Sequence, residues 1–204
     1  MSNYIFVIDG PDGVGKTTLI KMLTKYFNEC TSYKAHSLSP SNTEFGKGVK
    51  KLLNDFKPNN EVQKLLQLAT INYLNGEIEK ILYSEKLEVG NIIFLDRWLT
   101  STGVYQEYCH HGGQPFYHGE EFVSSLPRIT KKIILDAPDE VLDARLSERT
   151  EKEIYETDEF QRKVREGYRH IFDYRIGNHT KVYLDGTLEE NFKKLLSVVI
   201  DNLH

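Results

Sequence analysis

The stretch "GPDGVGKT" (Gly10–Thr17) has the G-x-x-x-x-G-K-T spacing of a loop that binds the phosphates of a nucleoside triphosphate. Its glycines let the backbone turn tightly and aim several N–H groups at one anion. Lys16 would place its charge on the outer phosphates, and the hydroxyl of Thr17 would bind Mg²⁺. We therefore expect an ATP site with Mg²⁺. Its residues are Gly10, Asp12, Gly13, Val14, Gly15, Lys16, Thr17 and Thr18.

A second pair of charged residues, Asp96 and Arg97, closes the apolar run "NIIFLD". Such a run predicts a buried strand, and ligands of parallel sheets bind beyond the carboxyl ends of the strands. Asp96 would hold Mg²⁺ through water, and Arg97 would fork two N–H bonds onto a phosphate. On their own, Asp96 and Arg97 would be interpreted as a surface ion pair. Beside a phosphate loop they favour a functional site.

These motifs require elements that position them, and short apolar strands alternate with longer helical patterns along the chain. The alternation predicts βαβ units, a parallel sheet and a single α/β domain, residues 1–204. With the phosphate loop at its start, we expect the P-loop NTPase fold, a five-stranded parallel sheet sandwiched between helices. Strands are expected at residues 4–8, 33–38, 91–96, 131–138 and 181–185. Helices are expected from the phosphate loop to about residue 27 and at residues 44–56, 60–87, 98–110, 139–149, 158–174 and 188–203.

The composition excludes several classes of protein. The chain has 204 residues, a net charge of −4 and no long basic run, which argues against a nucleic-acid partner. Its two cysteines form no C-x-x-C pair, so neither a disulfide framework nor a zinc site is indicated. No apolar stretch approaches the length that spans a bilayer, and no signal peptide is recognised. A cytoplasmic location is the default, and the absence of N-K-x-D argues against a GTPase.

Five segments, spread over nearly the whole chain, share the spacing of one enzyme family. They are "GPDGVGKTT", "DRW" (Asp96–Trp98), "STGVYQ" (Ser101–Gln106), "LDAPDEV" (Leu135–Val141) and "EIYETDEFQRKVREGY" (Glu153–Tyr168). In combination they resemble the thymidylate kinases, which phosphorylate dTMP to dTDP with ATP. The phosphate loop is common to many families, whereas the combination of the second and third segments is much less so.

The resemblance implies roles for the residues on the acceptor side. Arg97 would hold the 5′-phosphate of the acceptor, and Asp12 would meet its sugar or its magnesium. Thr102 and Gln106 would line the pyrimidine pocket, and Tyr105 would crowd the 2′ position and favour deoxyribose. A helix over residues 98–110 would place three of these side chains on one face. The acceptor residues expected are Asp12, Tyr73, Arg97, Ser101, Thr102, Tyr105 and Gln106.

Gly13 stands where some members of this family have an arginine. In members with glycine at this position, catalytic arginines come from a lid segment instead. Arg145 and Arg149 are the candidates in this chain. The alternative interpretation is a solvated charged helix. The lid, about residues 148–156, would close to keep water from the phosphoryl group. The catalytic residues expected are Lys16, Asp96, Arg97, Arg145 and Arg149.

Two segments depart from the family pattern. "HSLSPSN" (His36–Asn42) keeps the proline but lacks the arginine that usually precedes it, and "LLQLATINYLNGE" (Leu65–Glu77) lacks a stacking Phe and a following Arg. Tyr73 would stack on the base instead, with Asn72 or Asn75 as hydrogen-bond donors.

The departures leave alternatives open beside a dTMP kinase. These are a deoxynucleotide monophosphate kinase with altered or broad base specificity, a deoxynucleoside kinase, and a regulatory ATPase without a small acceptor. A deoxynucleoside kinase would generally show Glu-Arg-Ser in place of Asp-Arg-Trp, which counts against it. The resemblance also implies a homodimer, and the charge and apolar pattern favour a chain that binds no nucleic acid and no membrane.

Overall fold

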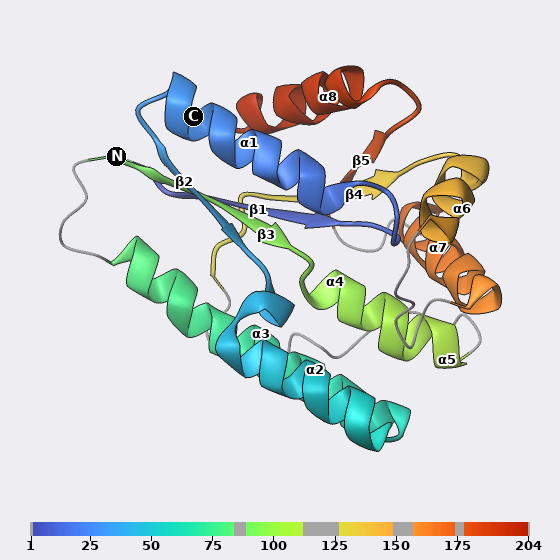
Figure 1. Ribbon diagram of the computed structural model, residues 1–204. Helices are drawn as coiled ribbons and strands as arrows, with labels where there is room; N and C mark the ends of the chain where they lie inside the picture. The colour runs from blue at the N-terminus through green and yellow to red at the C-terminus, as the bar shows by residue number, and fades with distance from the viewer. Residues whose placement is uncertain (1, 84–88, 112–126, 149–156, 174–177, 204) are drawn as a thin grey trace.

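The computed structural model describes residues 2–83, 89–111, 127–148, 157–173 and 178–203. Five parallel strands form one sheet in the order β2-β3-β1-β4-β5 (Figure 1). The strands are β1 (Tyr4–Asp9), β2 (Lys34–Leu38), β3 (Asn91–Asp96), β4 (Lys131–Asp136) and β5 (His179–Tyr183). The predicted five-stranded parallel sheet is confirmed. The last strand lies two residues earlier in the chain than expected.

Helices cover both faces of the sheet, as predicted (Figure 1). Helices α1 and α8 lie on one face, and α3 lies on the other. The bounds of the helices are α1 (Lys16–Cys30), η1 (Pro40–Asn42), α2 (Glu44–Phe56), α3 (Asn60–Leu82), α4 (Leu99–Thr102), η2 (Gly103–Tyr108), α5 (Cys109–His111), α6 (Asp139–Ser147), α7 (Asp158–Asp173) and α8 (Leu188–Ile200).

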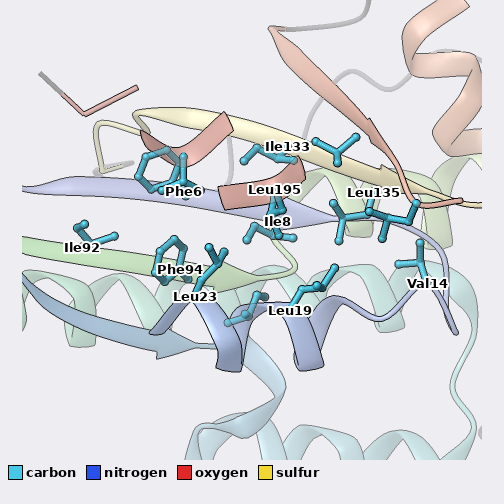
Figure 2. Close-up of a cluster of buried hydrophobic side chains, with 14 of the residues drawn as sticks. Phe6, Ile8, Val14, Leu19, Leu23, Ile92, Phe94, Ile133, Leu135 and Leu195 are labelled. Atoms are coloured by element: carbon cyan, nitrogen blue, oxygen red, sulfur yellow. The ribbon is translucent and has the colours of Figure 1, made fainter. Parts of the chain in front are cut away.

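The central strands are apolar on both faces because both faces are covered. Phe6 and Ile8 of β1 pack against α1 and α8, a cluster that Figure 2 shows, whereas Ile5 and Val7 point to the opposite face and meet α3. A third cluster joins Ile134 of β4 to η2 and α7. The carboxyl ends of β1, β3 and β4 are thereby held together at one edge of the sheet.

Local capping explains where several helices begin. The side chain of Thr43 accepts a hydrogen bond from the backbone N–H of Gly46 at the start of α2, and Asn59 does the same for Val62 at the start of α3. Thr187 and Glu190 form a reciprocal capping box at α8. These signals are local, so α2 was predicted with its observed bounds.

The segment after β3 differs from the continuous helix expected over residues 98–110. It consists of α4, then η2 wound as a π-helix, then α5. The expected lid, from residue 149 onward, lies outside the described residues. Within the described part of the chain, no helix is both long and apolar enough to cross a membrane.

Candidate active site

The phosphate loop joins β1 to α1, as its motif predicted. Gly10, Gly13 and Gly15 all have positive φ angles, of 144°, 79° and 97°. A Cβ atom added to Gly10 would lie 2.4 Å from the carbonyl oxygen of Leu135 in the neighbouring strand β4. Both the backbone conformation and this close approach therefore require glycine at position 10.

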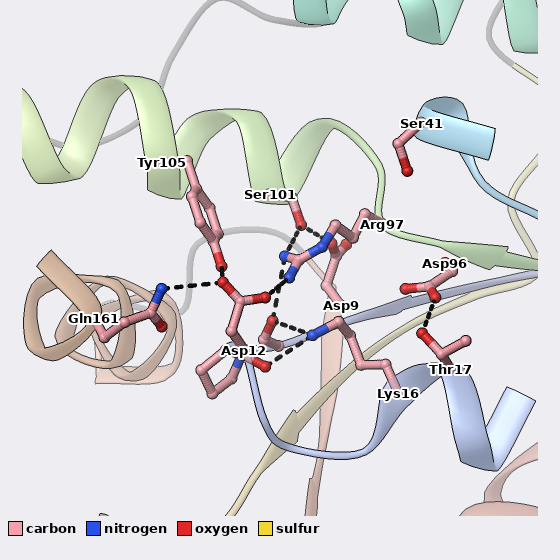
Figure 3. Close-up of polar contacts among 12 residues, drawn as sticks. Asp9, Asp12, Lys16, Thr17, Ser41, Asp96, Arg97, Ser101, Tyr105 and Gln161 are labelled. Carbon is pink, nitrogen blue, oxygen red and sulfur yellow. Dashed lines mark hydrogen bonds and ion pairs between the residues drawn. The ribbon is translucent and has the colours of Figure 1, made fainter. Parts of the chain in front are cut away.

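Lys16, the first residue of α1, is buried beneath the loop. Its ammonium group donates hydrogen bonds to the carbonyl oxygens of Gly10 (2.9 Å) and Pro11 (2.8 Å), as Figure 3 shows. Burial, followed by repulsion from Arg97, lowers the pKa of Lys16 to about 7. A phosphate group would offer this ammonium the negative charge that two neutral carbonyls do not supply.

Thr17 and Asp96 meet beside the loop, although they are 79 residues apart in the chain. The hydroxyl of Thr17 donates a hydrogen bond of 2.7 Å to the carboxylate of Asp96 (Figure 3). A hydroxyl and a carboxylate are oxygen ligands of the kind that Mg²⁺ prefers, and few protein ligands are needed when phosphates and water complete the shell. The pair therefore fits the magnesium site that the sequence suggested.

Arg97 has a left-handed backbone conformation, with a φ angle of 73°. A non-glycine residue with such a φ angle is strained, and strained residues cluster at functional sites. Its guanidinium group forms a short ion pair with Asp12 through Nη2. Among the described residues, the Nη1 atom makes long contacts, 3.3 Å to the hydroxyl of Ser101 and 3.5 Å to the carbonyl oxygen of Gly10.

Three donors from distant parts of the chain converge on the carboxylate of Asp12 (Figure 3). Besides Arg97, these are the hydroxyl of Tyr105 at 2.7 Å and the side-chain amide of Gln161 at 3.0 Å. Burial disfavours the ionised carboxyl, but the charges of Arg97 and Lys16 outweigh it and hold the pKa of Asp12 below its usual range. Asp12 is therefore a fixed negative charge at this end of the site.

Gln161 of α7 was missed by the sequence analysis. It lies in a stretch of charged residues that indicates only a surface helix, yet its side chain is 2% exposed. The sequence offered one weak signal, a neutral amide at helical spacing from the buried Val164 and Tyr168.

Ser101 and Asp9 form a polar layer beneath Arg97. Asp9 accepts hydrogen bonds from the hydroxyl of Ser101 and from the backbone N–H of Trp98, and Ser101 also contacts the hydroxyl of Tyr168 at 2.7 Å. Asp9 is buried, and burial raises the pKa of its carboxyl. These contacts anchor the start of α4, so Ser101 holds the helix in place as well as contacting Arg97.

One cavity of about 1130 Å³ joins the loop to the predicted acceptor side. Helices α4 and η2 contribute Thr102, Tyr105 and Gln106 to its lining. The helical spacing of these three residues predicted that they lie together. The opposite wall comes from Val49 and Leu53 of α2. The expected ATP-site residues that line it are Asp12, Gly13, Val14, Gly15, Lys16, Thr17 and Thr18.

Tyr73 does not lie with the other expected acceptor residues. Its ring stacks on Phe45, with centroids 5.2 Å apart, and lines a separate cavity of about 540 Å³. The α3 residues that line the main cavity are Gln67, Thr70 and Ile71. Tyr73 follows Ile71 by two positions, which turns its side chain roughly 200° around the helix. Asn72 and Asn75 do not line the main cavity in the part of the chain that is described.

Arg145 reaches the phosphate loop from α6. Its guanidinium donates hydrogen bonds to the carbonyl oxygens of Gly13 (3.2 Å) and Val14 (3.3 Å), and it lines the main cavity. The side chain is exposed and can exchange these carbonyls for phosphate oxygens. The second expected arginine, Arg149, lies outside the described residues.

The architecture and the sequence match known proteins along most of the chain. The chain is 28% identical to a probable thymidylate kinase of Methanococcus aeolicus, covering 98% of this chain and 97% of that one. It is 24% identical to a thymidylate kinase of Bacillus mycoides, with full coverage of both chains. Thymidylate kinase structures from Candida albicans and Ehrlichia chaffeensis share the fold, with TM-scores of 0.75 and 0.72 at 19% identity, covering 98% of this chain and 92% and 100% of theirs. Finally, the family model described as "Thymidylate kinase" matches residues 8–192, and the chain therefore belongs to the thymidylate kinase family.

Proposed function

We propose that this kinase transfers the γ-phosphoryl group of ATP to the 5′-phosphate of dTMP, giving dTDP and ADP. The observation that carries the proposal is the single cavity shared by the phosphate loop and by Arg97, Thr102, Tyr105 and Gln106. A donor site and a second phosphate site that open into one cavity suit transfer between two bound nucleotides. The relatives named as thymidylate kinases support dTMP as the acceptor.

Phosphoryl transfer depends more on the positioning of the reactants and on positive charge than on acid–base catalysis. An oxygen of the acceptor phosphate attacks the γ-phosphorus, the bond to the β,γ-bridging oxygen breaks, and ADP leaves. Lys16, the loop N–H groups and Arg145 would stabilise the negative charge that spreads over the transferred phosphoryl group in the transition state. Lys16 would exchange its two carbonyl partners for phosphate oxygens, which favour its charged form.

Arg97 is suited to the acceptor phosphate because its two nitrogen atoms differ. Nη2 is held by the ion pair with Asp12, which fixes the guanidinium, while Nη1 has only long contacts and can bind an anion without breaking a strong bond. Asp12 itself repels phosphate and would face the acceptor sugar. Tyr105 is held beside it and would lie against the 2′ position.

Mg²⁺ would be held by Thr17 and Asp96, and when bound it supplies positive charge on the phosphates. We further propose a homodimer in the cytoplasm that binds neither nucleic acid nor membrane, and a lid at about residues 148–156. The net charge of −4 and the family membership support these properties. Sedimentation of the purified chain tests the oligomeric state.

A coupled assay of ADP release tests the function. ATP and Mg²⁺ are supplied with dTMP, dUMP, dCMP, dGMP, dAMP or thymidine, and turnover is compared with ATP alone. We expect dTMP to give the highest kcat/KM. Equal turnover with several monophosphates would indicate broad base specificity, and turnover with thymidine alone would indicate a nucleoside kinase. ATP hydrolysis that no acceptor stimulates would refute the proposal.

A further inference from the structure

Helix α6 carries Arg145, but the helix has little apolar anchoring of its own. It is 9 residues long, and Leu142 is its one buried residue. The residue that precedes it, Pro138, provides no side-chain cap for its first turn. Isolated helices shorter than about 12 residues are marginal in water, so the position of α6 must depend on its neighbours.

One face of α6 lies on the phosphate loop. A Cβ atom on Gly13 would be 3.3 Å from both the carbonyl oxygen of Leu142 and a side-chain carbon of Leu146. Arg145 extends from this side to the carbonyl oxygens of the loop. A small rotation of α6 would therefore move the guanidinium of Arg145 relative to the phosphates.

The adjoining side of α6 carries Asp139 and Asp143, one helical turn apart, and lies against α7. Arg165 of α7 pairs with Asp143 (Nη2–Oδ1, 2.5 Å) and approaches Asp139 (Nη1–Oδ1, 3.6 Å). Arg169, one turn further along α7, pairs with Asp139 at 2.7 Å. Figure 1 shows the two helices side by side. Two arginines of one helix thus hold two acids of the other.

Helix α7 is the better-anchored partner of the two. Its Val164, Tyr168 and Ile171 are buried in the cluster that includes β4, and its Gln161 holds Asp12. The side chain of Arg165 is 7% exposed, whereas that of Asp143 is 69% exposed. The buried arginine therefore belongs to the fixed part of the site and the exposed acid to the part that it holds.

We propose that Arg165 is a positioning residue, which keeps Arg145 over the phosphate loop by holding Asp143 of α6. The inference rests on the proposed function in one respect, the use of Arg145 in phosphoryl transfer. Arg165 acts through α6 and touches neither nucleotide. Loss of the ion pair should therefore lower kcat and leave the KM for dTMP unchanged.

The test is a double-mutant cycle that combines Asp143→Asn with Arg145→Ala. Asp143→Asn removes the charge from an exposed position, so the chain should fold, and thermal unfolding checks this. We expect about a tenfold loss of kcat from Asp143→Asn alone, with the KM for dTMP within about twofold of the wild type. In the Arg145→Ala background, the same substitution should change kcat by less than about twofold.

Two further variants complete the experiment. Glu140→Gln removes an equal charge from α6 at an exposed residue with no ion pair among the described residues, and it should leave kcat unchanged. Arg165→Lys keeps the charge and should retain more activity than Arg165→Met.

The outcomes separate this inference from the proposed function. Equal losses from Asp143→Asn in the wild-type and Arg145→Ala backgrounds would overturn the inference alone. An unchanged kcat for Asp143→Asn in the wild type would also overturn it. Wild-type kcat in Arg145→Ala would refute the role of Arg145 in phosphoryl transfer, and the inference with it. An ADP-release assay in which no monophosphate stimulates turnover would refute the proposed function itself.

Discussion

The two ends of the main cavity are built in different ways. The donor end is built around one contiguous loop, whose backbone carbonyls hold the ammonium of Lys16, and Asp96 and Arg145 are added to it from elsewhere. The acceptor end is made of side chains from four separate parts of the chain. These are Asp12 of the loop, Arg97 after β3, Tyr105 of η2 and Gln161 of α7.

This difference implies different responses to substitution. At the donor end the loop backbone remains when a side chain is removed, so a substitution should have a large but local effect. At the acceptor end three donors share one half-buried carboxylate, so the loss of one donor changes the environment of the others. Coupling between substitutions should therefore be strong at the acceptor end and weak between the two ends.

Lys16→Met should have the largest effect, because it removes the positive charge that lies within the phosphate loop itself. We expect kcat to fall about 10³-fold, as when a charge-stabilising group of a transition state is lost. The KM for dTMP should change by less than about threefold. Steady-state kinetics provide both values, with Lys21→Met on the exposed side of α1 as the control. A rise in the KM for dTMP as large as the loss of kcat would contradict the separation of the two ends.

Arg97→Lys should come next, with about a 10²-fold loss of kcat/KM for dTMP. Lysine keeps the charge but cannot hold Asp12 with one nitrogen and a phosphate with another. The affinity for ATP, measured by calorimetry without acceptor, should remain within about twofold. The exposed Arg162→Lys on α7 is the matched control. Unchanged dTMP kinetics in Arg97→Lys would rule out a forked contact with the acceptor.

The pair Tyr105→Phe and Gln161→Leu should reveal the coupling at the acceptor end. Both wild-type side chains donate to the same oxygen of Asp12, so each single variant leaves one donor in place. Each should lower kcat/KM for dTMP by roughly three- to tenfold, and the double variant should lose more than the product, by about tenfold. Strictly multiplicative effects would show that the two contacts act independently.

The smallest predicted effect is a change in proton uptake when ATP binds. The pKa of Lys16 is lowered to about 7 from its ordinary value of 10.5, so at pH 8 the free side chain is mostly neutral. Phosphates raise this pKa, so binding at pH 8 should take up to about one proton, whereas at pH 6 Lys16 already carries it. Calorimetry in buffers of different ionisation enthalpy measures the uptake. Subtraction of the Lys16→Met value removes the titration of ATP itself, and an equal uptake in both proteins would exclude Lys16 as its source.

The donor end could be predicted because its information is local in the chain. Glycine at Gly10, the charge of Lys16 and the hydroxyl of Thr17 follow one another at a fixed spacing between a strand and a helix. The helix bounds of α2 could be predicted for the same reason, since Thr43 caps it within four residues. Thr17 and Asp96 were each assigned to the same magnesium ion from their own motifs, and the structure brings the two side chains into contact.

The acceptor end could be predicted only in part, because its geometry depends on contacts between distant residues. Spacing placed Thr102, Tyr105 and Gln106 on one helix face, and they do line the cavity. Residue spacing could not show that α7 brings Gln161 to Asp12, because the two residues are 149 positions apart in the chain. The sequence did not indicate that Tyr73 lines a separate cavity, because the rotation of α3 depends on how the helix packs.

The strand order has a consequence for how the protein is made. Strand β2 pairs only with β3, and β1 pairs with β3 and β4, so the first two strands of the chain do not touch each other in the sheet. During synthesis, β1 and β2 therefore lack their shared pairing partner β3 until residues 91–96 have left the ribosome. That late strand also carries Asp96 and is followed by Arg97. The pairing of β3 with β1 and β2 therefore forms the first part of the sheet and also brings Asp96 and Arg97 to the phosphate loop.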